Sequence, residues 1–243
     1  QLQFDTDGND FTMQYTSTRD ASVRCTASQA IAQGLAADGG LLTPCYIPKL
    51  AGSALEDLKG MSYQQRAIYI MKHFLEEFSV KELTDFASAA YGPEKFDTPA
   101  VAPVRTLNDT THCLELWHGP TCAFKDMALQ MLPHLLTASL TKTEEFKTVF
   151  ILVATSGDTG KGALAGFQDV PRTKILVFYP KDGVSQVQQL QMITQEGENV
   201  GVAAVQGNFD DAQTGVKRLF SDEKLRQILA EKGYFFSSAN SIN

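Results

Sequence analysis

Short apolar runs alternate with stretches of helical spacing from Pro99 to the end of the chain, and this alternation restricts the fold more than any other feature. A strand, a helix and another strand in this rhythm favour a parallel sheet whose two faces are covered by helices. The runs expected to form strands are Leu114–Trp117, Thr148–Ala154, Ile175–Tyr179, Val200–Val205 and Tyr234–Ser237. The stretches expected to form helices lie near residues 124–140, 160–168, 185–194, 209–220 and 222–232. Pro133 should kink the first of these helices or split it in two.

The part of the chain before Pro99 has helical spacing without such runs. One short helix is expected from Ser28, and Asp38-Gly39-Gly40 stops it. Two further helices begin at capping-box pairs, which are Ser62 with Gln65 and Ser79 with Glu82. Each of them has an apolar face that we interpret as core. The faces consist of Ala67, Ile70, Met71, Phe74, Leu75 and Phe78 in the first and of Leu83, Phe86, Ala87 and Ala90 in the second.

The two patterns together predict an α/β protein with two regions. A mainly helical region is expected over residues 13–98, and an α/β region with a parallel sheet flanked by helices is expected over residues 99–243. The chain has 243 residues, of which 43% are hydrophobic and 20% charged, so it can bury a core.

Charge and cysteine content exclude several classes of partner. The chain has 21 Lys and Arg against 28 Asp and Glu, a net charge of −7, so neither nucleic acid nor an anionic membrane is an expected partner. The longest apolar run, Val149 to Ala154, is far shorter than the roughly 20 residues of a membrane-spanning helix. Four cysteines without a C-x-x-C pair favour reduced thiols and a cytoplasmic protein.

A zinc site formed by His112, Cys113, His118 and Cys122 is the one metal site that the sequence suggests. The spacing matches no usual set of zinc ligands. His112 and Cys113 would also point to opposite faces of a strand. No metal is therefore expected.

The segment from His118 to Asp126 could carry chemistry because a lysine stands where a helix is expected to begin. The positive end of a helix disfavours an ammonium group, so we expect the pKa of Lys125 to fall. A lysine that is partly neutral can attack a carbonyl and form a Schiff base. Asp126 in the first helical turn suits the helix dipole, which is also a purely structural role.

The segment from Thr155 to Gly160 follows the most apolar run and precedes a helix. Its glycines and the helix N-terminus leave backbone N–H groups available for a carboxylate or phosphate, and Ser156 and Thr159 add hydroxyl donors. In an open parallel sheet, ligands bind at the carboxyl ends of the strands. The alternative is that the glycines only permit a tight turn and that Asp158 caps the helix.

Two nucleotide-binding motifs also overlap this second segment. A Walker A loop fails twice, because Thr155 stands where the first glycine belongs and Gly162 where Ser or Thr belongs. The dinucleotide fingerprint fits Gly160 to Ala165, with Asp182 near the distance expected for a ribose contact. Its glycines would lie inside the helix rather than in the preceding turn. A nucleotide-binding oxidoreductase therefore stays an alternative.

With both segments in view, the sequence resembles the threonine synthase family of pyridoxal-phosphate (PLP) enzymes, of the fold-type II or tryptophan-synthase-β-like class. The lysine segment and the Ser-Gly-Asp-Thr-Gly segment carry most of the likeness. The segments that match, in family order, are Tyr15–Arg19, Ala30–Leu41, His118–Asp126, Ala154–Gly160 and Ser238–Asn243.

The resemblance implies a role for each matching residue. Lys125 would hold PLP as a Schiff base and later act as a base at the α- and β-carbons of the substrate, with Phe124 and Asn240 beside the cofactor. His118 and Thr121 would line the substrate site. The residues implied to hold the substrate, chiefly its carboxylate, are Thr155, Ser156, Gly157, Asp158, Thr159 and Gly160.

The implied reaction converts O-phospho-L-homoserine and water into L-threonine and phosphate. The enzyme would be a carbon–oxygen lyase that acts on phosphates, a monomer, and a member of threonine biosynthesis. Two further alternatives stay open: a related PLP-dependent phospho-lyase that gives a keto acid, and a non-catalytic interaction protein that has kept the fold.

The sequence departs from the family pattern at three points. Arg24–Ala27 replaces the usual entry to the first helix, and Pro133 interrupts a helix expected to be continuous. Family members also continue beyond the position of Asn243 into a second glycine-rich loop that holds the cofactor phosphate. Gly207-Asn208-Phe209 is similar to that loop but comes too early. We therefore expect a truncated chain that binds PLP weakly and has little activity, which the near-visible absorbance of the purified protein would test.

Overall fold

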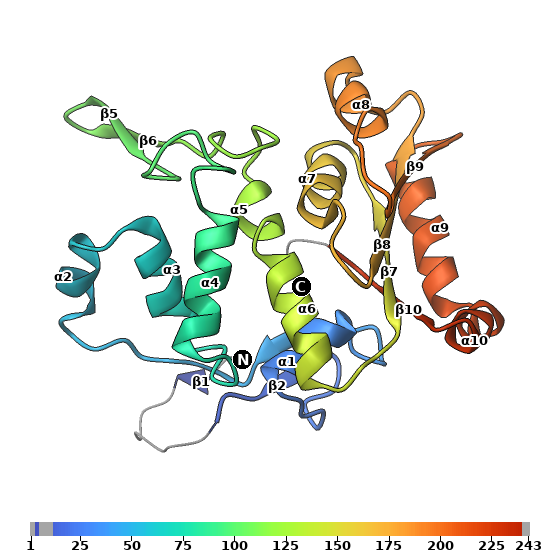
Figure 1. Ribbon diagram of the computed structural model, residues 1–243, viewed down its shortest axis with the longest axis horizontal. Helices are drawn as coiled ribbons and strands as arrows, with labels where there is room; N and C mark the ends of the chain where they lie inside the picture. Colours follow the sequence, from blue (N-terminus) through green and yellow to red (C-terminus); the bar gives the residue numbers. More distant parts are fainter. Residues whose placement is uncertain (1–2, 5–11, 240–243) are drawn as a thin grey trace. The chain divides into compact units, whose positions relative to one another are not determined.

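The computed structural model describes residues 3–4 and 12–239, and it divides into two compact units. The first unit comprises residues 1–119 and the second comprises residues 120–243. The sequence predicts a boundary earlier, between residues 98 and 99, where the apolar pattern changes. The difference arises because the segment after Pro99 first forms a hairpin that stays with the first unit (Figure 1).

The first unit contains short helices and small two-stranded sheets. Its helices are α1 (Ala27–Gln33), α2 (Ala54–Lys59), α3 (Tyr63–Met71) and α4 (Val80–Ala90). Its strands are β1 (Gln3–Phe4) paired with β4 (Tyr46–Ile47), β2 (Tyr15–Ser17) with β3 (Leu42–Pro44), and β5 (Val104–Asn108) with β6 (Thr111–Leu114). The helices expected from Ser28, Ser62 and Ser79 are present as α1, α3 and α4. α2 was not predicted, because it is too short to show a period.

Both predicted capping boxes in the first unit are confirmed. At α3, the Ser62 hydroxyl accepts from the Gln65 amide at 3.2 Å, and the Gln65 side chain accepts from the Ser62 amide at 2.8 Å. The corresponding box of Ser79 and Glu82 starts α4. Leu83, an expected core residue of α4, is completely buried.

The apolar stripe assigned to the first of these helices is only partly helical. α3 ends at Met71, and its residue Ile70 is exposed. Phe74 and Phe78 lie beyond it in successive turns, where the Phe74 amide bonds to the Met71 carbonyl three residues earlier. The prediction of one continuous helical face was wrong because tight turns with a repeat of three residues give nearly the same apolar spacing as a helix.

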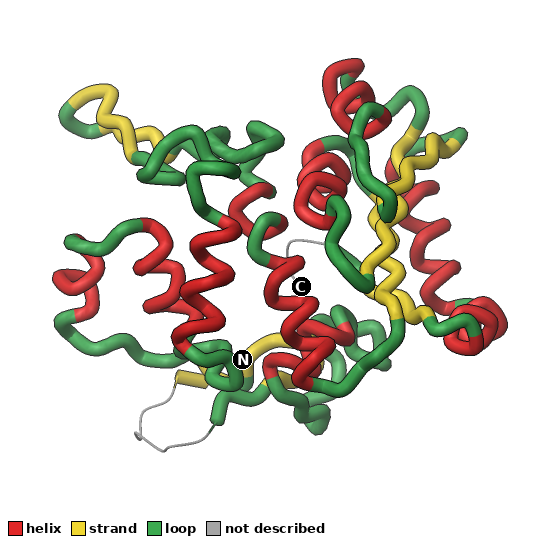
Figure 2. The backbone as a smooth tube through the Cα atoms, viewed as in Figure 1, coloured by secondary structure: helices red, strands yellow, loops and turns green. Residues whose placement is uncertain are grey.

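The second unit is built on a parallel sheet with the strand order β10-β7-β8-β9. The strands are β7 (Thr148–Ala154), β8 (Thr173–Pro180), β9 (Val200–Val205) and β10 (Tyr234–Ser237), and every pair is parallel. Val149, Ile151 and Val177 on the central strands are almost completely buried. The predicted fold class, a parallel sheet flanked by helices, is confirmed (Figure 2).

Helices cover this sheet on both faces. Figure 1 shows α7 (Asp158–Phe167) on one face and α9 (Phe209–Ser221) on the other. The remaining helices of the unit are α5 (Asp126–Leu129), α6 (Leu132–Lys142), α8 (Gln186–Ile193) and α10 (Glu223–Glu231). The expected break at Pro133 is confirmed, since α5 and α6 are separate and Pro133 lies in the first turn of α6, where its missing N–H has no helical partner to lose.

One predicted strand is wrong. Of Leu114–Trp117, only Leu114 lies in a strand, and that strand is β6 of an antiparallel hairpin with β5. All residues of β5 are exposed. This strand therefore has no buried apolar face from which the sequence could predict the hairpin. The Asn108 side chain accepts from the Thr110 amide at 3.1 Å and stabilises the tight turn between the two strands.

The approach of α5 to α7 depends on a glycine. A Cβ atom at Gly166 would collide with the backbone carbonyl of Leu129, the last residue of α5. A backbone group cannot move aside as a side-chain end can, so the two helices approach this closely only because residue 166 has no side chain.

Gly166→Ala should therefore lower the free energy of unfolding by about 1–3 kcal/mol through overpacking. Gly215→Ala in α9 is the matched control, because a Cβ there meets nothing within 4 Å. The control should raise stability by about 0.5–1 kcal/mol, the usual gain from replacing a glycine inside a helix. Urea unfolding of both variants checks the pair, and a Gly166→Ala protein as stable as the control would contradict the packing argument.

Candidate functional site

Lys125 stands at the start of a single helical turn. It is the N-cap residue of α5, a helix of four residues, and its side chain is half-buried. Its Nζ atom lies 4.7 Å from the centre of the Phe124 ring, in a cation–π contact. The predicted helix start at this lysine is thus confirmed, although the helix is short.

A buried carboxylate closes the loop that contains Lys125. Asp126 has no exposed surface, and its side chain accepts a hydrogen bond from the Thr121 amide at 2.8 Å and another from the Thr121 hydroxyl at 2.7 Å. Burial raises the pKa of Asp126, whereas these hydrogen bonds and the positive charge of Lys161 lower it. The hydrogen bonds tie residue 121 to residue 126 and so fix the backbone on both sides of Lys125.

These contacts give Thr121 and Asp126 a definite structural role. Thr121 was predicted to line the substrate site, but its hydroxyl is buried and donates to Asp126. Asp126 was interpreted as a helix-dipole residue, and it also serves as the acceptor that closes the loop. Contact of Thr121 with a substrate stays a prediction.

Lys161 is a residue that sequence reasoning missed. It lies on α7, half-buried, and its Nζ donates to the Gln195 side-chain oxygen at 2.5 Å. Burial lowers the pKa of Lys161, and the negative charge of Asp126 opposes this shift. A signal was present, because Lys161 stands in the otherwise small and apolar stretch from Gly160 to Gly166.

The loop after β7 is shaped by the Thr155 hydroxyl. This hydroxyl is buried, accepts from the Gly157 amide at 3.0 Å and from the Gly160 amide at 2.9 Å, and donates to the Gly157 carbonyl. Thr155 therefore folds the loop from inside. The Thr155 hydroxyl thus already makes hydrogen bonds within the protein. Its contact with a substrate stays a prediction.

The remaining backbone donors of the loop lie at or just before the start of α7. Within the described residues, the structure records no acceptor for the backbone amides of Ser156, Asp158 and Thr159. Asp158 and Thr159 open a helix of ten residues, α7, and Ser156 is exposed. Amides at a helix N-terminus attract anions because they are unpaired and carry the positive end of the helix dipole. Binding of an anion at these amides stays a prediction.

The alternative readings of this loop find less support. Gly157, with φ 154°, is the helix cap, and α7 has no side-chain cap, so Asp158 does not cap it. Gly160 and Gly162 lie inside α7, as expected, and not in a turn that could receive a dinucleotide. At Gly162, an added Cβ would lie 3.3 Å from the Lys125 Cβ, so this face of the helix packs on the lysine segment.

The Gly207-Asn208-Phe209 stretch does not present an open anion site either. Asn208 caps α9 in a capping box, and the Asp211 carboxylate accepts from the Asn208 amide at 2.8 Å. A carboxylate already occupies the N-terminus of this helix, so a phosphate would be repelled there.

His118 belongs to the first unit and is held between two carboxylates. Its Nδ1 lies 2.6 Å from Asp97 Oδ1, and its Nε2 lies 3.0 Å from Glu115 Oε2. Both ring nitrogens can donate only in the charged imidazolium. Glu115 first, and then Asp97, raise the pKa of His118. Its predicted place beside the substrate stays a prediction, and Asn240, predicted to contact the cofactor, lies outside the described residues.

The suspected zinc ligands do not form a metal site. His112 and Cys113 are neighbours in β6, and the His112 Nδ1 lies 3.0 Å from the Thr106 hydroxyl. Over the described ranges, no group of His, Cys, Asp or Glu could hold a metal ion. The four cysteines are free thiols. Among the helices of the described residues, none is both long and apolar enough to cross a bilayer.

Comparison with known proteins gives a consistent result. A family profile described as "Threonine synthase N terminus" matches residues 14–91. Human "Threonine synthase-like 1" is 39% identical over 225 residues, which cover 89% of this chain and 30% of the relative. Threonine synthase of Pseudomonas aeruginosa is 38% identical over 232 residues, 95% of this chain and 48% of the relative.

A solved structure agrees with these relatives. The crystal structure of PLP-bound threonine synthase from Brucella melitensis superposes with a TM-score of 0.83 at 36% identity, covering 95% of this chain and 48% of that chain. The chain thus spans at most about half the length of the proteins it matches.

The charge of His118 can be tested by titration. We expect its pKa to lie above the ordinary value of about 6.5. Glu115→Gln should lower it more than Asp97→Asn, because the Glu115 side chain is 14% exposed and that of Asp97 is 75% exposed. NMR titration of the ring protons measures both shifts, and the His112 signal, whose neighbours are unchanged, is the internal control.

The raised pKa also fixes the direction of the effect on stability. The pairing stabilises the fold fully below the unfolded-state pKa of about 6.5, and this stabilisation is lost as the pH rises through the higher folded-state pKa. A wild-type His118 that titrates below its Glu115→Gln counterpart would contradict the pairing.

Proposed function

We propose that this chain, which belongs to the threonine synthase family, supplies the reactive lysine and the substrate-carboxylate loop of a PLP-dependent lyase. The reaction is the conversion of O-phospho-L-homoserine and water into L-threonine and phosphate. The human and Pseudomonas aeruginosa relatives extend well beyond the part that this chain matches. The activity of the whole enzyme is therefore proposed for this chain.

The observation that carries the proposal is the packing of the lysine segment against α7. This helix begins at the loop Thr155–Gly160, called the anion loop below. Lys125 contacts α7 at Gly162, and the unpaired amides of Ser156, Asp158 and Thr159 lie at the N-terminus of the same helix. The proposed reactive amine and the proposed anion-binding helix end thus belong to elements that pack on each other, α5 on α7 and α7 on β7. An amino-acid substrate needs both, since its amine reacts while its carboxylate is held.

The residues fit PLP at its aldehyde end. Lys125 offers a primary amine on a fixed backbone, and the exposed Phe124 ring beside Nζ offers an aromatic surface. When bound, PLP supplies an electron sink for the carbon that carries the amino group. The phosphate end has no counterpart at Gly207–Phe209, because the Asp211 carboxylate fills that helix end.

The chain's own residues then have separate tasks. The amides of Ser156, Asp158 and Thr159 hold the substrate carboxylate and so orient its α-carbon. Lys125 Nζ, in its neutral form, accepts the proton from the α-carbon and moves protons at the β-carbon. Asp126 and Thr121 touch no substrate in this scheme and keep the backbone of Lys125 in place.

A trapping experiment tests the amine. Incubating the chain with PLP and then with borohydride should label the peptide that contains Lys125, as peptide mass mapping shows. Lys125→Ala should lose this label, whereas Lys224→Ala, which removes an exposed lysine on α10, should keep it. A label that persists elsewhere at full yield in the Lys125→Ala protein would remove the basis of the proposal.

A product assay tests the reaction itself. With O-phospho-L-homoserine and excess PLP, the wild type should form phosphate and L-threonine only slowly, because the chain is expected to bind PLP weakly. Lys125→Ala should lower this rate by about 10² or more, the usual effect of losing a general base. The assay also measures 2-oxo acid, because the human relative is named threonine synthase-like and not threonine synthase. Phosphate release with an oxo acid and no threonine would favour the related phospho-lyase.

A further inference from the structure

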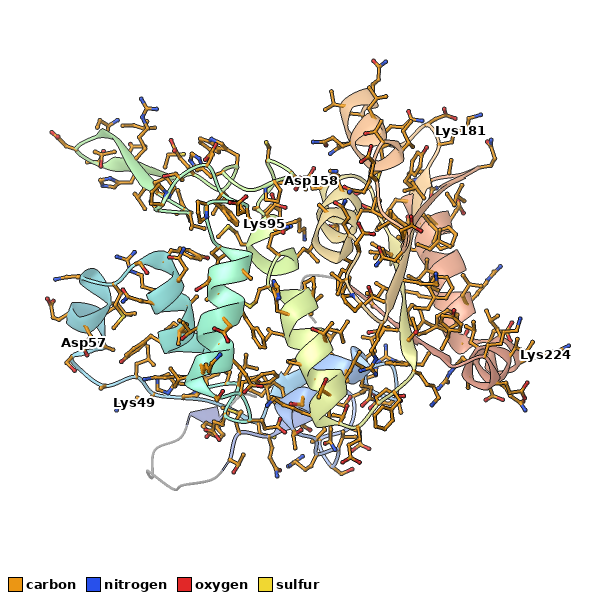
Figure 3. The ribbon with its side chains drawn as sticks, viewed as in Figure 1. Lys49, Asp57, Lys95, Asp158, Lys181 and Lys224 are labelled. Carbon is orange, nitrogen blue, oxygen red and sulfur yellow. The ribbon has the colours of Figure 1, made fainter. Side chains whose placement is uncertain are left out.

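The side chain of Gln188 on α8 reaches the anion loop from outside. Its Nε2 atom donates a hydrogen bond to Asp158 Oδ1 at 2.9 Å. Asp158, labelled in Figure 3, is the first residue of α7. The contact links helices whose starting residues are far apart in the sequence, so no motif in the sequence could indicate it.

The other end of the Gln188 amide is occupied as well. Its Oε1 atom accepts from the Ser185 amide at 3.2 Å and from the Ser185 hydroxyl at 3.1 Å, in the capping box of α8. The oxygen must face these donors and the nitrogen must face the carboxylate, because a reversed amide would place donor against donor. The orientation of the Gln188 side chain is thus fixed from both ends.

Gly157 leaves the space that this side chain fills. A Cβ atom at Gly157 would lie 2.7 Å from Gln188 Cδ, so the amide rests directly against the loop backbone. Gly157 also has φ 154°, a conformation that residues with a side chain rarely adopt. The loop and the Gln188 side chain are therefore complementary in shape.

This contact bears on the repulsion between Asp158 and an anion bound at the loop. The Asp158 carboxylate is attached to one of the very residues whose amides would bind the substrate carboxylate, and two negative charges there repel each other. The hydrogen bond from Gln188 holds the Asp158 side chain toward α8. We propose that Gln188 is a positioning residue that keeps the amides of Ser156, Asp158 and Thr159 open to a substrate carboxylate.

The inference rests on the proposed function and adds a second element to its site, α8. This helix is itself fixed by the completely buried Met192 and by a hydrogen bond of 3.2 Å from Gln189 to the Tyr179 hydroxyl. Much of its remaining apolar surface is exposed, including Val187, Leu190 and Ile193. Gln188 therefore makes the geometry of the loop depend on α8.

Gln188→Glu separates the two roles of this side chain. A glutamate can still accept from Ser185, so the capping box of α8 is kept. It cannot donate to Asp158 and instead places a second carboxylate opposite the first. Gln186→Glu is the matched control, because it adds the same charge to the same turn at an exposed side chain for which the described residues show no hydrogen bond.

The readout is the affinity of the loop for a carboxylate, with acetate as the probe. Titration followed by NMR should shift the amide signals of Ser156, Asp158 and Thr159 in the wild type and equally in Gln186→Glu. In Gln188→Glu the apparent affinity should fall about fivefold to tenfold. Adding Asp158→Asn to Gln188→Glu should restore most of it, because the asparagine amide can donate to the new glutamate. The thermal unfolding midpoints should stay close, which separates positioning from loss of fold.

The outcomes distinguish this inference from the proposed function. If Gln188→Glu binds acetate as well as the wild type does, or if the double variant regains nothing, the role of Gln188 is wrong while the anion loop stands. If the wild type itself shows no shift of the three amides, both the loop and the positioning role are overturned.

Discussion

The carboxylate of Asp126 has no contact with water and receives two hydrogen bonds from one residue, Thr121. A buried carboxylate without partners would destabilise the fold severely, so these bonds are a condition for burying Asp126 at all. Once they are made, the chain between residues 121 and 126 has little freedom. Lys125 lies in this short loop, and its backbone position follows from the hydrogen bonds of its neighbours. Gly162 and Gly166 on α7 then let the loop and α5 pack closely.

Side-chain hydrogen bonds also shape the loop after β7. The Thr155 hydroxyl is buried and accepts from the amides of Gly157 and Gly160, while Gln188 holds Asp158 from outside. These polar side chains shape the loop, and the amides of Ser156, Asp158 and Thr159 have no recorded acceptor among the described residues. A motif rich in Ser, Thr, Asp and Gly thus contains two kinds of residue. Some use their polar groups to fold the loop, and others leave them available to a ligand.

Local signals in the sequence predicted much of this fold. The strands β7, β9 and β10 have the expected limits because each is a short apolar run in the sequence between polar or helical stretches. The capping boxes at Ser62 and Ser79 mark the starts of α3 and α4, since a cap is a bond between residues three apart. Pro133 separates α5 from α6 for an equally local reason. The errors have the opposite cause. β5 is exposed throughout, and Phe74 and Phe78 imitate a helical face from within successive turns.

The sequence by itself indicated which residues are candidates for chemistry: a lysine before a helix, and a glycine-rich loop between a buried strand and a helix. These features depend on residues that are neighbours in the chain, so they can be recognised in the amino-acid sequence. Only the tertiary structure decided how those residues are used. Lys161 beside Asp126, Gln188 on Asp158, and Gly166 against the Leu129 carbonyl join positions that are more than twenty residues apart. Such contacts arise when elements pack around the sheet, because burial and close approach are properties of the assembled chain that no local pattern records.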